Sequence, residues 1–170
     1  MKNTVLITTL LLAPLAVFAA DSKSEPASGQ AAAFSRIKSL VGEWQADTPM
    51  GNARLTLELV ASGTAVLERE SIGDMPPMVT MYYLDGNRLL LTHYCMVGNQ
   101  PRMQAQNYDA ATKELKFQFV DATNLASPTA AHMHSATFRF IDDQHFKSAW
   151  DFYDGGKPKE THTAEYTRVR

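Results

Sequence analysis

Residues 145–156 read His-Phe-Lys-Ser-Ala-Trp-Asp-Phe-Tyr-Asp-Gly-Gly, and this stretch decides the fold. Its large apolar side chains, Phe146, Trp150 and Phe152, share one face of an extended chain, because successive side chains of a β-strand point to opposite faces. The run Asp154-Gly155-Gly156 that follows consists of residues that tolerate tight-turn dihedrals. The stretch therefore predicts a half-buried strand that ends in a hairpin turn.

The same alternation recurs along the chain. Leu55, Leu57 and Leu59 alternate with polar residues, and a second run of this kind spans 115–119. Turn-forming clusters such as Asp85-Gly86-Asn87 separate the runs. We predict strands at 43–48, 52–61, 64–73, 77–85, 88–96, 102–109, 114–122, 131–142, 145–153 and 159–169.

Short loops join these strands in sequence, which makes an antiparallel meander of about ten strands. A flat sheet of this width would expose two edges and a large apolar face, so we expect it to close on itself. The predicted fold class is all-β, an antiparallel up-and-down β-barrel; the alternative is a β-sandwich, whose long Greek-key connections the short loops disfavour. Such a barrel is too wide for side chains alone to fill and commonly holds a small ligand.

A short amphipathic helix precedes the strands. Phe34, Ile37 and Leu40 follow one another at three-residue steps, and Gly42 comes soon after them. This pattern predicts a helix over 33–40 whose apolar face packs against the barrel.

The first residues, 1–19, have the pattern of a cleaved signal peptide, since Lys2 precedes an apolar stretch that ends in small residues. A membrane anchor is the alternative, but spanning a bilayer needs about 20 uninterrupted apolar residues, and Pro14 interrupts this shorter run. No cysteine that could carry a lipid follows the small residues, so we expect a periplasmic or secreted protein. Small polar residues at 20–33 predict a flexible linker, and the barrel domain then covers 34–170.

Composition limits the partners. The chain has 170 residues, enough for one domain, and its 45% hydrophobic share is typical of a globular protein. Its 16 Lys and Arg are balanced by 18 Asp and Glu, which gives a net charge of -2 and disfavours nucleic acid and anionic membrane surfaces as partners. Cys95 is the sole cysteine, so no internal disulfide can form.

The segment Leu40-Val41-Gly42-Glu43-Trp44, where a short helix runs into Gly-x-Trp, resembles the opening of the calycin superfamily, which includes lipocalins, fatty-acid-binding proteins and nitrobindin-like barrels. Residues 93–95 (His-Tyr-Cys), 99–103 (Asn-Gln-Pro-Arg-Met) and 132–138 (His-Met-His-Ser-Ala-Thr-Phe) resemble those of an uncharacterised group of exported bacterial calycin-like proteins. The resemblance implies a closed barrel with a central cavity and a tryptophan packed across its base. It also implies a haem-binding alternative through His162, because nitrobindin-like barrels bind haem through a histidine late in the chain.

Histidines are the main candidates for chemistry. His132 and His134 share a strand face with Phe138, so all three are expected to point into the barrel. Two imidazoles at this spacing can reach one metal ion, and His93 or Cys95 from another strand could complete the shell. The alternative is that the histidines are hydrogen-bonded polar residues at the mouth of the cavity.

Methionines offer a further metal hypothesis, because thioethers together with imidazole and thiolate would suit Cu(I). Met75, Met78 and Met81 lie in and before one predicted strand, where three-residue steps alternate faces. We therefore expect these side chains to be adaptable lining or core rather than ligands of one ion.

Arg102 and Gln104 occupy one face of the strand at 102–109, and that face is either solvent or a polar cavity wall. In the second case Arg102 would hold a ligand carboxylate, as the inward arginine of fatty-acid-binding barrels does, or pair with Glu68 or Glu70.

The leading hypothesis is the carriage of a small, mostly apolar ligand, with or without a carboxylate. Its candidate contacts are His93, Arg102, Gln104, His132, His134 and Trp150. The first alternative is a metal site built from His93, Cys95, His132 and His134, or a haem site at His162. The second is an enzyme that uses His93 with Glu70 or Asp151, although the sequence carries none of the common hydrolase, phosphate-binding or zinc-protease motifs. The sequence singles out no cofactor.

Overall fold

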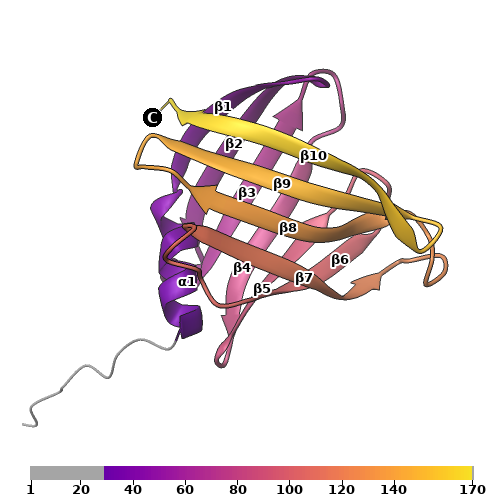
Figure 1. Cartoon of the computed structure of the whole chain (residues 1–170), viewed down its shortest axis with the longest axis horizontal. Helices are drawn as coiled ribbons and strands as arrows, with labels where there is room; N and C mark the ends of the chain where they lie inside the picture. The colour runs from indigo at the N-terminus through magenta and orange to yellow at the C-terminus, as the bar shows by residue number, and fades with distance from the viewer. Residues whose placement is uncertain (1–28, 170) are drawn as a thin grey trace, which may run out of the picture.

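The alternating run at 146–152 forms a strand, and so does each of the nine other predicted runs (Figure 1). The computed structural model describes residues 29–169. The strands are β1 (Gly42–Thr48), β2 (Gly51–Val60), β3 (Ala65–Ile72), β4 (Met78–Asp85), β5 (Arg88–Tyr94), β6 (Gln100–Ala105), β7 (Glu114–Thr123), β8 (His132–Phe140), β9 (His145–Asp154) and β10 (Lys157–Arg168), with helix α1 (Gly29–Ser39) before them and the 3-10 turn η1 (Ala61–Gly63) between β2 and β3.

Each strand pairs antiparallel with the next, and β10 returns to β1, so the sheet is a closed barrel. The predicted up-and-down barrel is confirmed, and the sandwich alternative is wrong. Closure leaves no free edge strand within residues 29–169, so the cost of two exposed edges, expected for a flat sheet, does not arise there.

The pairing that closes the barrel is short. Strands β1 and β10 pair at Trp44↔Arg168 and Gln45↔Thr167. Pairing between β1 and β2, in contrast, runs the whole length of β1, from Gly42 to Thr48. The closing strands are therefore held together at the end of the barrel where β1 begins.

Helix α1 begins earlier than predicted. Residues 29–33, expected to be linker, form its first turns, and the helical propensity of three consecutive alanines favours this. The side chain of Gln30 also fixes the helix start, because its Oε1 accepts a hydrogen bond from the Leu89 backbone N–H at 3.2 Å and its Nε2 donates to Asn107 Oδ1 at 3.2 Å. The predicted signal peptide and linker residues 20–28 lie outside the described residues. Within 29–169, no helix is long and apolar enough to span a membrane.

The helix covers one end of the barrel with the buried side chains of Phe34 and Ile37. Trp44 lies beneath it and donates its indole N–H to the Leu40 carbonyl at 2.7 Å. Arg168 stacks over Trp44 at 4.0 Å and donates to the carbonyls of Ser39 and Val41, each at 2.8 Å. Ser39 is the last residue of α1 and Val41 lies just beyond it, where carbonyls have no intrahelical partner, so Arg168 caps the helix as it closes the barrel.

Aromatic side chains fill the interior at the helix end. Phe146 contacts Trp44 edge-on at 4.7 Å and stacks on Tyr166 at 4.9 Å. Phe117, Phe138 and Tyr82 continue this packing across the barrel. Trp44 packs at the base, as the resemblance implied, and the hollow part of the barrel is left at the opposite end.

Candidate functional site

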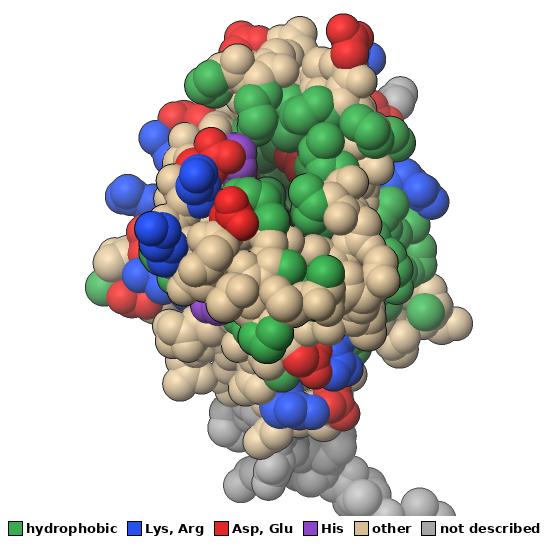
Figure 2. Space-filling view, turned by 90° about the vertical axis from the view of Figure 1, so that its right-hand side faces the viewer, with side chains coloured by type: hydrophobic (Ala, Val, Ile, Leu, Met, Phe, Trp, Pro, Cys, Tyr) green, Lys and Arg blue, Asp and Glu red, His purple; other side chains and the backbone are tan. Residues whose placement is uncertain are grey.

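A cavity of about 220 Å³ occupies the end of the barrel opposite α1. Figure 2 shows its opening, which hydrophobic side chains border on most sides. Its volume lies between the roughly 150 Å³ that accommodates benzene and the roughly 300 Å³ at which drug-sized pockets begin. The space suits a molecule of about one ring. Its apolar lining includes Met50, Ile72, Met75, Met78, Met133 and Phe152.

His93 is the central polar residue of this lining. It follows Leu89 and Leu91 on the inner face of β5 and is only 3% exposed. Its Nδ1 lies 3.0 Å from Thr80 Oγ1, and its ring centroid lies 5.0 Å from that of Trp150. Its Nε2 is buried and has no hydrogen-bond partner among residues 29–169.

Burial lowers the pKa of His93 to about 4, so the imidazole is neutral at neutral pH. A buried polar atom without a partner costs free energy, and such atoms are rare in folded proteins. A ligand in the cavity that hydrogen-bonds to Nε2 would remove this cost.

Two carboxyl groups lie on the inner face of β3. Tyr82 donates its hydroxyl to Glu68 at 2.7 Å, and Tyr166 donates to Glu70 at 2.5 Å. Burial, with a smaller contribution from the charge of Glu70, raises the pKa of Glu68 to about 8 against the effect of its hydrogen bonds from Tyr82 and Thr80. Burial also raises the pKa of Glu70, which lines the cavity directly.

Besides Glu70, the acidic side chain of Glu160 lines the cavity from β10, where its carboxylate lies 3.3 Å from His162 Nε2. His162 also lines the cavity, so the histidine implied by the haem resemblance does face the interior space. No lysine or arginine of the described chain contributes to the lining. The cavity therefore combines apolar walls with carboxyl groups and the neutral imidazole of His93.

Cys95 and several methionines line the same space. Burial raises the pKa of the Cys95 thiol, which keeps it protonated at neutral pH. Met75 and Met78 both line the cavity, although strand spacing predicted opposite faces. That expectation is wrong for this pair because Met75 lies in the turn before β4, where its N–H donates to the Ile72 carbonyl, and a turn has no strand alternation.

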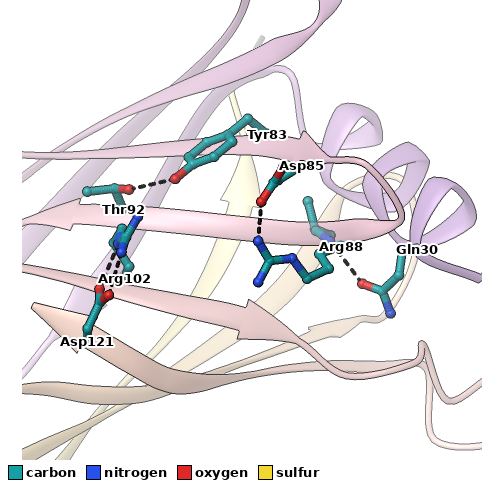
Figure 3. A network of polar contacts seen from close by, with 8 residues as sticks. Gln30, Tyr83, Asp85, Arg88, Thr92, Arg102 and Asp121 are labelled. Carbon is teal, nitrogen blue, oxygen red and sulfur yellow. Dashed lines mark hydrogen bonds and ion pairs between the residues drawn. The ribbon is translucent and has the colours of Figure 1, made fainter.

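Arg102 lies outside the barrel. Its inner-face neighbours Pro101 and Met103 are buried, while Arg102 is exposed and forms a two-point ion pair with Asp121 of β7 (Figure 3). The hydrogen bonds from Arg102 lower the pKa of Asp121. The predicted cavity-wall role of Arg102, and with it that of Gln104 on the same face, is wrong, and the solvent-face alternative holds.

His132 and His134 do not line the cavity either. A β-bulge opposite β9 between Met133 and Ser135 breaks the alternation of β8, so Met133 faces the cavity while Ala136 and Phe138 remain inside. The expectation that both histidines point inward with Phe138 is therefore wrong.

The two histidines instead bind each other. His132 Nε2 and His134 Nδ1 lie 3.0 Å apart, and the other nitrogen of His132, Nδ1, lies 2.7 Å from the Ala130 carbonyl. The ring of His134 is stacked between Tyr153, at 3.9 Å, and Phe119, at 4.9 Å. The chain from 29 to 169 contains no group of three or more His, Cys, Asp or Glu side chains placed to hold a metal ion.

The two remaining candidates, Trp150 and Asp151, lie on opposite faces of β9. Trp150 lines the cavity beside His93. Asp151 lies on the opposite face of β9, where it accepts hydrogen bonds from Ser135 at 2.5 Å and Thr161 at 2.6 Å. Of the two partners considered for a catalytic His93, Glu70 alone shares its cavity.

The tyrosines that hold the buried carboxyl groups were not predicted as site residues. Glu68 and Glu70 alternate with Arg69 and lie between the buried Val66 and Ile72. Acidic residues at period two on an otherwise apolar strand face are the signal that could have identified this polar interior.

The sequence matches no protein-family model and no curated protein. Among solved structures, the chain is similar to a protein of unknown function from the DUF3598 family of Nostoc punctiforme PCC 73102, with 15% sequence identity and a TM-score of 0.53. The match covers 78% of this chain and 48% of that one, so the chain spans about half the length of its structural neighbour. At this identity the similarity shows the barrel fold alone.

Proposed function

We propose that the protein binds a small, mostly apolar molecule of about one ring, with one hydrogen-bonding group directed at His93. The observation that carries the proposal is the unpartnered Nε2 of His93, buried in the wall of a 220 Å³ cavity. The thioether side chains around it are flexible and polarisable, which suits a pocket that adapts to its occupant. The version with a carboxylate held by Arg102 has no support, because Arg102 pairs with Asp121 outside.

Titration of the full chain with benzyl alcohol tests this proposal, because the probe has one ring and one hydroxyl. Trp150 lines the cavity, so its fluorescence should change saturably as the probe binds. His93→Phe keeps the ring and removes Nε2, and it should weaken binding by roughly five- to tenfold, the effect of one neutral hydrogen bond.

His145→Phe is the matched control, because this histidine lies near the opposite end of β9, with its side chain 43% exposed and bonded to Asp142. It should leave the benzyl alcohol affinity unchanged. A wild-type chain that shows no saturable binding, or a His93→Phe chain that binds as tightly as wild type, would contradict the proposal.

We also propose that the chain is an exported, calycin-like carrier. Lys2, the apolar stretch from Val5 to Phe18 and the small residues after it support export, and the closed barrel with one open end supports the calycin-like part. Intact mass of the protein recovered from outside the cytoplasm should correspond to a chain that has lost about the first 19 residues. A mass that still includes Lys2 to Phe18 contradicts the export proposal.

A further inference from the structure

The charge of the cavity points to a narrower class of ligand. We infer that the cavity selects a small protonated amine, bound by the carboxylate of Glu70 and by Nε2 of His93, over the neutral or anionic molecule of the same shape. The inference rests on the proposed function and adds the charge of the ligand.

The first step concerns which charges face the occupant. Glu70 and Glu160 line the cavity together with His162, whose Nε2 lies 3.3 Å from the Glu160 carboxylate, and within 29–169 no Lys or Arg side chain joins them there. Since Glu160 already has His162 beside it, Glu70 is the carboxyl group of the lining without an ion-pair partner within 29–169, and an anion in the cavity would face it. A cation would instead pair with the carboxylate of Glu70.

The second step concerns Glu70 itself. Its Oε1 accepts the hydroxyl of Tyr166 at 2.5 Å, which orients the carboxyl group on the cavity wall. Glu68, two residues earlier, is occupied by Tyr82 and is 4% exposed. Of the two carboxyl groups on β3, Glu70 is therefore the one that an occupant reaches, and a charge-assisted contact with an ammonium group is about twice as strong as a neutral one.

The third step concerns His93. When its Nδ1–H donates to Thr80 Oγ1, the lone pair of Nε2 is left as an acceptor in the cavity wall. Glu70 and His93 line the same cavity, and an ammonium group, with three donors and no acceptor, has enough donors for both the carboxylate and this lone pair. The rings of Trp150 and Tyr166 in the same lining add favourable faces for a cation.

The test compares benzylamine, benzyl alcohol and benzoate, which share a ring and differ in charge. Calorimetric titration of the full wild-type chain at neutral pH should give at least about tenfold tighter binding of benzylamine than of benzyl alcohol, and weaker binding still of benzoate. Glu70→Gln keeps an oxygen acceptor for Tyr166 and should reduce benzylamine affinity by about tenfold while changing benzyl alcohol affinity less than about twofold.

Glu58→Gln, at an exposed position of β2, is the control variant and should change neither affinity. A pH titration adds a second readout, in which benzylamine affinity should fall as the pH is lowered and Glu70 becomes protonated. The titratable groups around Glu70 are Glu68 of β3, Tyr82 of β4, His93 and Cys95 at the end of β5, and Glu160, His162 and Tyr166 of β10.

The outcomes separate the two proposals. Equal or tighter binding of benzyl alcohol to the wild-type chain overturns the amine inference and leaves the proposed function standing. Failure of all three probes to bind overturns both. A Glu70→Gln chain that is folded by circular dichroism yet binds benzylamine as wild type does also overturns the role of Glu70.

Discussion

Two polar residues inside the barrel, His93 and Glu68, are kept neutral by their surroundings. Burial moves the pKa of His93 down to about 4 and that of Glu68 up to about 8, so each loses its charge at neutral pH. Tyr82 and Thr80 provide the hydrogen bonds that make burial of these groups tolerable. These two positions are therefore polar without being charged at neutral pH, while Glu70, unlike Glu68, lines the cavity.

Glu68 should make stability decrease with rising pH. Its folded-state pKa lies above its ordinary value of 4.5, so its contribution is complete below pH 4.5 and is lost as the pH rises through about 8. The lowered pKa of His93 acts in the opposite direction, but only as the pH falls below 6.5. Between pH 6.5 and 8 the free energy of unfolding should fall by no more than about 1.4 kcal/mol per pH unit for one such group.

Urea unfolding of wild type and Glu68→Gln across that range measures this dependence. The variant should show a shallower slope, because an amide does not titrate, and the exposed Glu58→Gln control should follow wild type. A Glu68→Gln slope equal to that of wild type would show that Glu68 is not the group responsible.

The side of the barrel wall on which Arg102 and Gln104 lie could not be predicted from the sequence. Alternation placed Arg102 and Gln104 on one face but not on a particular side of the wall, and the deciding partner, Asp121, comes from another strand. The choice of side depends on pairing between distant segments, which a local pattern does not contain.

At the scale of elements, the bulge in β8 is the feature that the sequence could not reveal. Strand existence was predicted correctly at 131–142, and the inward placement of Phe138 is confirmed. One extra residue opposite β9 then changes the side on which His134 lies. A bulge arises from the pairing of two strands. Alternation along one strand alone therefore predicts the wrong face for residues beyond the bulge.

Helix α1 should be required for stability rather than for ligand contact. Phe34 belongs to the buried face of α1, is only 4% exposed, and lies at the end of the barrel opposite the cavity. Phe34→Ala should lower the free energy of unfolding by about 3–5 kcal/mol, the usual cost of removing a buried aromatic side chain.

Denaturant unfolding measures that loss, with Ser35→Ala at the exposed neighbouring position as the control. The control should remain within about 0.5 kcal/mol of wild type. If Phe34→Ala lowered the free energy of unfolding as little as the control does, the packing of the helix on the barrel would not stabilise the fold.

At the scale of the whole molecule, the closed ten-strand barrel was predictable because its determinants are local. Alternating runs, turn residues and short loops fix the meander, and the cost of free edges favours closure. The division of the interior into a filled end and a hollow end was not predictable, since it depends on how Trp44, Phe146 and Tyr166 meet from separate strands.

Arg168 should stabilise the closed barrel at the junction between β10 and β1. It donates to carbonyls of Ser39, Val41 and Asp143, each at 2.8 Å, at the site where β10 meets β1. Arg168→Met keeps much of the side-chain length and removes these donors, so the free energy of unfolding should fall by about 2–3 kcal/mol. Thermal and urea unfolding measure the change; Arg139→Met, at an exposed position of β8, is the control, and an equal effect of both variants would contradict this role.

The short pairing between β1 and β10 bears on how long a molecule bound as we propose would stay. Thr48 of β1 and Thr163 of β10 both border the cavity, beyond the paired positions at Trp44 and Gln45. A molecule in the cavity would thus lie against a part of the wall beyond the paired positions, which we expect to widen more readily than fully paired strands, whose separation would require local unfolding. Release should accordingly be fast even when occupancy is high, a kinetic behaviour that suits delivery of a molecule better than its storage.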